Sequence, residues 1–135
     1  MALKLGSITD AQTGVIKIVD PETGADTGAT ITLAGPENPL RKAREWERAK
    51  VLRARMFAEG KFSAPDLEDE QAAKTELLVA STLAWDGIED ASGPVVMTAA
   101  AARALYTDPA HQWLRRQVED ALGKRELFIG RSATA

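Results

Sequence analysis

Two stretches near the N-terminus are rich in β-branched residues and are bounded by residues that favour turns. Residues 13–19 read TGVIKIV, residues 29–33 read ATITL, and the segment Asp20–Gly28 between them consists mostly of turn-forming residues. The pattern predicts two antiparallel strands joined by this loop. Because an isolated hairpin is only marginally stable in water, it must pack on helices or on a second subunit.

Helical periodicity begins at Asn38–Pro39, where an Asn cap precedes a proline at the first helical position. The pattern predicts a helix over Pro39–Glu59, with Gly60 as its stop. At about 100° per residue, the apolar side chains fall on one arc, which we expect to be buried. They are Leu40, Ala43, Trp46, Val51, Ala54 and Phe57. An adjoining stripe is basic and holds Arg41, Arg44, Arg48 and Arg55.

Three more helices are predicted further along the chain. The first spans about residues 65–85, with an acidic first turn, which the helix dipole favours, and an apolar second half. Beyond a loop over 86–97, Thr98 caps a short alanine-rich helix. Asp108 and the proline after it start the last helix, which Gly123 closes. We expect the large apolar residues Trp85, Leu105, Trp113, Leu114 and Val118 to lie in the core.

Together these elements predict a mainly α, α+β fold, in which a small N-terminal β-hairpin precedes a bundle of about four helices. We expect the hairpin region to cover residues 1–37 and the helical domain to cover 38–130. The small, polar residues 131–135 predict a frayed tail.

Composition narrows the classes of protein that the chain can belong to. The 135 residues carry a formal net charge of −3, which argues against general affinity for nucleic acid or membranes. The absence of cysteine excludes disulfides, thiol catalysis and cysteine-ligated metals. No apolar run is long enough to span a bilayer, and the N-terminus lacks the apolar core of a signal peptide. We therefore expect a cytoplasmic protein.

Candidate catalytic and metal-binding groups are few. His111 is the only histidine, and the nearest acid in the sequence, Asp108, is expected to serve as a helix cap. A general base needs an orienting partner, and a metal site needs several converging ligands. Asp86, Glu89 and Asp90 lack the spacing of a calcium loop, and no P-loop, dinucleotide fingerprint or nucleophile elbow is present. We therefore expect a protein that is not an enzyme and that uses no cofactor or metal.

Opposite charges are concentrated in consecutive segments. Residues 41–61 hold eight Lys or Arg against three Glu, and residues 66–76 hold five Asp or Glu against one Lys. The simpler interpretation is that two helices pack antiparallel with these charges facing each other, each exposed pair contributing about 0.2–1 kcal/mol. The alternative is a surface for an acidic protein or, less favoured because the stripe lacks interleaved aromatics, for nucleic acid. Such a surface would use Arg41, Arg44, Trp46, Arg48, Arg55, Met56 and Phe57.

The C-terminal half carries an ordered set of landmarks, which read WDGIED, SG, PVVMT, AAARALY and DPAHQWLRRQV. This order resembles the C-terminal half of the tail assembly chaperones of long-tailed bacteriophages. The matching positions are Trp85, Gly87, Gly93, Leu105, Trp113, Val118 and Phe128. The N-terminal half agrees through the turn Asp20–Gly24, a second strand and a proline before an arginine-rich helix. The resemblance thus spans about residues 15–128.

The resemblance implies a mostly helical, non-enzymatic protein that is made during virion assembly in the cytoplasm of the host bacterium. Such a protein coats the long, apolar tape-measure protein and recruits tail-tube subunits, and its own copies can shield its apolar surface as a homo-oligomer. Two alternatives stay open. One is a structural minor tail protein retained in the virion, and the other is a small nucleic-acid-binding regulator that uses the Arg41–Arg55 stripe.

Overall fold

The computed structural model describes residues 2–59 and 67–131. Helix α1 (Pro39–Glu59) has the bounds that the sequence predicts. Its predicted stop at Gly60 and the predicted start of the next helix near Pro65 lie outside the described residues. The predicted tail does too, apart from Arg131, which ends the last strand.

A three-stranded antiparallel sheet, in the order β2-β3-β4, organises the molecule. Strands β2 (Thr13–Val19) and β3 (Asp26–Ala34) form the predicted hairpin, although β3 begins earlier than expected and shortens the loop. Strand β4 (Thr82–Asp86) joins the other side of β3, where Trp85 lies opposite Ile31. The sheet therefore combines strands from the N-terminal and the central parts of the sequence.

Strand β4 shows that the prediction of one helix reaching Trp85 is wrong. Helix α2 (Leu67–Ser81) ends at Ser81, and the chain continues directly as a strand. A short apolar run of this kind fits a helix or a buried strand equally well, so the tertiary environment decides between them. Here the free edge of β3 supplies backbone partners, and the hydroxyl of Thr82 donates to the carbonyl oxygen of Leu78 at 2.8 Å where helix changes to strand.

The C-terminal half continues as helix α3 (Ala99–Thr107), a 3₁₀ turn η1 (Pro109–His111) and helix α4 (Gln112–Leu122). Both predicted caps are confirmed, because side-chain oxygens of Thr98 and Asp108 accept backbone N–H bonds at 3.0 and 2.9 Å. The Asp–Pro signal starts a 3₁₀ turn first, and α4 follows it.

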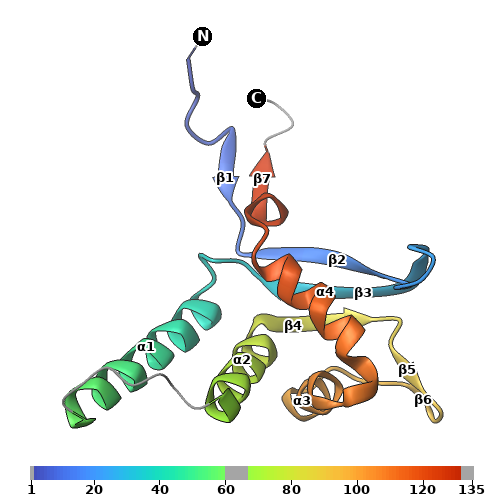
Figure 1. Cartoon of the computed structure of the whole chain (residues 1–135). Helices are drawn as coiled ribbons and strands as arrows, with labels where there is room; N and C mark the ends of the chain where they lie inside the picture. The colour runs from blue at the N-terminus through green and yellow to red at the C-terminus, as the bar shows by residue number, and fades with distance from the viewer. Residues whose placement is uncertain (1, 60–66, 132–135) are drawn as a thin grey trace.

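The core lies between one face of the sheet and helices α2, α3 and α4, which gather on the same side of it (Figure 1). Its buried members are Ile18, Ala29, Ile31 and Leu33 from the strands and Leu78, Val79, Ala102, Tyr106, Leu114 and Val118 from the helices. Because side chains alternate along a strand, Val15 and Lys17 point to the opposite face and are exposed. The fold is therefore α+β, with its core shared between sheet and helices.

Two parts extend from this core (Figure 1). Strand β1 (Ile8–Asp10) pairs with β7 (Ile129–Arg131), which follows the 3₁₀ turn η2 (Arg125–Phe128), and forms a separate two-stranded ribbon. Helix α1 leaves the end of β3 and runs outward beside α2. Elsewhere, β5 (Glu89–Asp90) and β6 (Gly93–Pro94) form a small hairpin within the predicted loop over 86–97. In the described ranges, none of the helices combines the length and apolar character that crossing a bilayer requires.

Candidate functional site

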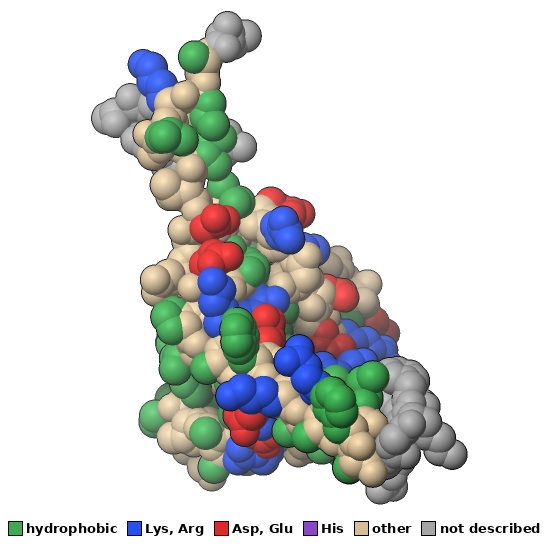
Figure 2. Space-filling model, turned by 90° about the vertical axis from the view of Figure 1, so that its left-hand side faces the viewer, with side chains coloured by type: hydrophobic (Ala, Val, Ile, Leu, Met, Phe, Trp, Pro, Cys, Tyr) green, Lys and Arg blue, Asp and Glu red, His purple; other side chains and the backbone are tan. Residues whose placement is uncertain are grey.

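Helix α1 presents its apolar arc to solvent, so the prediction that this arc is buried is wrong. Trp46 is 70% exposed and Phe57 is 82% exposed, whereas large aromatic side chains in a core are nearly inaccessible. Leu40 and Val51 are exposed as well. Figure 2 shows hydrophobic side chains interleaved with Lys and Arg on the side of the molecule where α1 lies. The helix packs on its neighbour with a different side.

The basic stripe of α1 faces helix α2. Arg44 lies 3.8 Å from Glu76 and Arg48 lies 4.0 Å from Glu70, so opposite charges meet across the two helices as the simpler interpretation predicts. Glu76 also accepts two hydrogen bonds from Arg103 of α3, at 2.8 and 3.0 Å. These bonds, together with the charges of Arg103 and Arg44, lower the pKa of Glu76 below its ordinary value despite an opposing contribution from burial.

Arg41 anchors the first turn of α1 to the core. Its guanidinium group donates to the carbonyl oxygens of Leu122 and Ala34 at 2.9 and 3.2 Å, and to Glu45 at 3.1 Å. The same group lies 5.9 Å from the centre of the Phe128 ring, within reach of a cation–π interaction. With its side chain only 11% exposed, Arg41 holds the helix in place and offers little surface to a partner.

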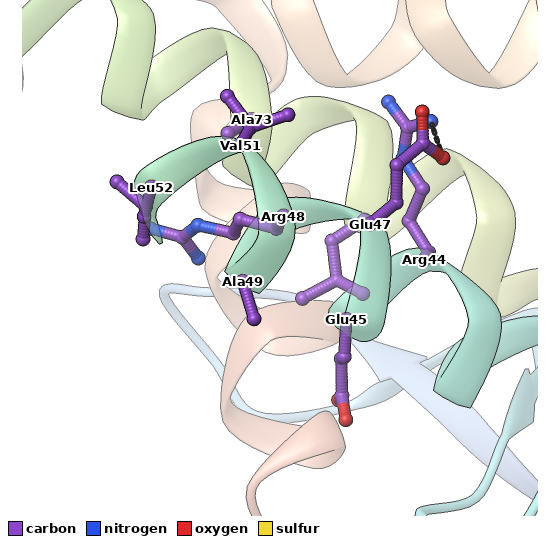
Figure 3. Close-up of a pocket in the computed structure, with 9 residues that line it drawn as sticks. Arg44, Glu45, Glu47, Arg48, Ala49, Val51, Leu52 and Ala73 are labelled. Carbon is purple, nitrogen blue, oxygen red and sulfur yellow. Dashed lines mark hydrogen bonds and ion pairs between the residues drawn. The ribbon is translucent and has the colours of Figure 1, made fainter. Parts of the chain in front are cut away.

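An open groove of about 530 Å³ separates much of α1 from α2 (Figure 3). Apolar walls come from Val51 and Leu52 on α1 and from Ala73 and Leu77 on α2. Arg44 also lines it and bonds Glu47 on its own helix at 3.3 Å, the dashed contact in Figure 3. Apart from the Arg41 anchor, α1 is thus held to the body largely by charged contacts beside a groove that its apolar side chains do not fill.

The side of α1 away from α2 forms one continuous stripe, which we call the free face. It consists of Ala43, Trp46, Lys50, Ala54 and Phe57, spaced three or four residues apart along the helix. Trp46 and Phe57 stand about 16 Å apart along the axis, at 1.5 Å per residue. The apolar arc and the basic stripe predicted from the sequence include neither Lys50 nor the neighbouring Arg53. Both residues lie on the same side of α1 as Trp46 and Phe57 and are exposed. Arg55 and Met56, which the sequence assigned to a partner, are exposed near the end of α1.

The residues that the sequence assigned to the core lie at different depths. Leu114 is 6% exposed and Val118 is fully buried in α4. Trp85, Leu105 and Trp113 are half-buried and pack against the outside of the core. Tyr106 and Phe128 are fully buried, although they were not among the expected core residues. Each follows a leucine directly, Tyr106 in α3 and Phe128 in η2.

His111 lies beside Asp108 at the start of α4. Its Nδ1 atom is 3.2 Å from one oxygen of Asp108, and the other oxygen of Asp108 caps the 3₁₀ turn. Both side chains are less than half exposed. Within residues 2–59 and 67–131, no three His, Cys, Asp or Glu side chains are placed to hold a metal ion. Asp108 is accounted for by its role as the cap of the 3₁₀ turn.

Comparison of the chain with protein-family models, with curated proteins and with solved structures gave no match. The fold and the free face of α1 define the class of protein: an α+β protein with an exposed helix that carries aromatic and basic side chains.

Proposed function

We propose that this protein is a tail assembly chaperone, which binds the tape-measure protein and recruits tail-tube subunits in the cytoplasm of the host bacterium. The observation that carries the proposal is the exposure of Trp46 and Phe57 on the free face of α1. The landmarks of the C-terminal half support the same family. The proposal needs no catalytic residue and no cofactor.

The free face suits a client that is both apolar and acidic. Each aromatic ring can bury roughly 150–250 Å² against a partner, which makes Trp46 and Phe57 the natural anchors of a contact. Helix α1 carries seven Lys or Arg and three Glu, so a client with acidic side chains beside its apolar ones is attracted to it. Lys50 and Arg53 would repel the same residues of a second α1, which favours a different polypeptide over self-pairing at this face.

The arginines that a nucleic-acid-binding regulator would use are engaged elsewhere. Arg41 bonds the core, and Arg44 and Arg48 face carboxylates of α2. The protein-binding proposal needs none of these three side chains to be accessible, because it rests on the opposite side of the helix.

Co-expression with a tape-measure protein tests the proposal directly. We expect the wild-type chain to keep this client in the soluble fraction, and the double variant Trp46→Ala, Phe57→Ala to lose that effect. The matched control is Val15→Ala, Val96→Ala, which removes two exposed apolar side chains (56% and 79%) outside α1 and should behave like the wild type.

Two results would count against the chaperone. One is a client whose solubility is the same with the wild type and with the α1 double variant, across several tape-measure proteins. The other is a stoichiometric amount of the chain in purified virions, measured by mass spectrometry, because that result assigns it to the tail structure.

A further inference from the structure

A second concave site lies between the sheet and the last two helices, at the end of the molecule opposite α1 (Figure 1). It is a pocket of about 380 Å³, which we call the Trp85–Trp113 pocket. Its apolar lining includes both tryptophans together with Ile88, Val95 and Leu105. Because these side chains are half-buried, the pocket presents aromatic and aliphatic surface that the fold itself leaves uncovered.

The walls of the pocket are fixed by the backbone around them. The indole Nε1 of Trp85 donates to the carbonyl oxygen of Val95 at 2.8 Å, which ties strand β4 to the segment after β6. Gly87 follows with a φ of +75°, and a Cβ at this position would lie 2.7 Å from the carbonyl oxygen of Gly28. The chain therefore passes tightly against β3 here, and the tryptophan ring is held in one position before any partner arrives.

The charged groups of this pocket are all acidic. Glu89, Asp90 and Asp108 line it, no Lys or Arg does, and the one imidazole in the lining, that of His111, lies beside Asp108. Asp108 is already occupied by the turn it caps and by His111. In the described part of the chain, Glu89 and Asp90 form no ion pair, and the one bond that Asp90 accepts, from the Ser92 amide at 2.7 Å, uses a single carboxylate oxygen.

We propose that the Trp85–Trp113 pocket binds the side chain of an arginine or lysine presented by a partner polypeptide. The aliphatic stem of such a side chain packs on the apolar walls, its cationic end stacks on an indole face, and Glu89 and Asp90 neutralise the charge. This contact has the opposite charge preference to the free face of α1. It goes beyond the chaperone proposal and shares no residue with the free face of α1, so that either contact can fail alone.

The three indole N–H groups of the chain provide the readout. In ¹H–¹⁵N spectra of the full labelled chain, we expect the blocked peptide Gly-Arg-Gly to shift the Trp85 and Trp113 signals saturably while Trp46 stays in place. The isosteric peptide Gly-citrulline-Gly lacks the charge and should bind about tenfold more weakly. A response equal for both peptides, a response at Trp46 alone, or no saturable response overturns the proposal.

Two double variants distinguish the effect of the pocket carboxylates on peptide binding from the effect of the net charge of the molecule. Glu89→Gln with Asp90→Asn should weaken arginine-peptide binding about fivefold or more, and Asn keeps the oxygen that accepts the Ser92 bond. Glu22→Gln with Glu126→Gln removes the same charge outside the pocket and should leave binding unchanged. Equal binding by both double variants overturns the role of Glu89 and Asp90. Indole shifts that follow protein concentration without any peptide assign the pocket to a second copy of the chain and also overturn it.

Discussion

At the scale of single residues, Tyr106 shows how the core handles a polar group. Its ring is fully buried, and its hydroxyl lies 2.6 Å from Oγ1 of Thr82, the residue with which β4 begins. The carbonyl oxygen of Tyr106 accepts bonds from Gln112 and Arg115 at 3.0 and 3.1 Å. Burial of the hydroxyl raises the pKa of Tyr106 to about 12, and the Thr82 bond offsets part of this effect.

This pKa makes the stability of the fold sensitive to alkaline pH. The unfolded chain loses its tyrosine proton near pH 10, whereas the folded chain retains it up to about pH 12. The contribution is fully present below pH 10 and is lost as the pH rises towards 12, because deprotonation favours the unfolded state. Tyr106 is the only tyrosine, so tyrosinate absorbance reports on it alone. A folded protein that titrates with a midpoint near 10, as in denaturant, would contradict the burial of the Tyr106 hydroxyl.

At the scale of elements, Glu76 joins three helices through two arginines. It sits on α2, receives two bonds from Arg103 of α3 and lies 3.8 Å from Arg44 of α1. Its lowered pKa keeps the carboxylate charged at more acidic pH than an ordinary glutamate. The stabilising contribution is therefore present above the ordinary carboxyl range and is lost when acidification passes through the pKa of the folded state.

Replacing Glu76 should loosen α1 without unfolding the core. We expect Glu76→Gln to increase hydrogen exchange along α1 while strands β2 and β3 keep their protection, since the groove beside α1 supplies little packing to compensate. Glu47→Gln is the matched control, because it removes a contact with Arg44 inside α1 and leaves the pair with Glu76 intact. Equal exchange of α1 in both variants would mean that the Arg44–Glu76 pair does not hold the helix against α2.

At the scale of the whole molecule, Phe128 lies where the core, α1 and the ribbon meet. It is 2% exposed, its ring lies under the Arg41 guanidinium, and the next residue begins β7. A Cβ at Gly14 or Gly35 would approach the ring to 3.0 Å, so the backbone of the sheet passes directly against it. Phe57 is the same residue type at the far end of α1, and it is 82% exposed.

Phe128 and Phe57 should differ strongly in their response to the same substitution. We expect Phe128→Ala to lower the free energy of unfolding by about 3–5 kcal/mol, because it opens a cavity in close-packed surroundings. Phe57→Ala should change it by less than about 0.5 kcal/mol, because the ring is already in water. Chemical denaturation measures both values. Comparable losses for the two variants would place Phe57 in a packed environment and remove the free face.

Local signals in the sequence were sufficient for those parts of the fold that depend on near neighbours. The start of α1 follows from its Asn–Pro pair, and the caps at Thr98 and Asp108 follow from side-chain oxygens that satisfy backbone groups a few residues away. The β2–β3 hairpin follows from β-branched runs around a turn-rich segment.

Only the tertiary structure decided which apolar surfaces are covered. The run ending at Trp85 became a strand because β3 offered it an open edge, and the arc through Trp46 and Phe57 stayed in water because ion pairs turned the arginine side of α1 towards α2. Periodicity in the sequence identifies a hydrophobic face, but the partner of that face is set by contacts between residues far apart in the chain. For α1, the sequence determined the helix and the composition of its sides, and the tertiary contacts determined which side stays exposed.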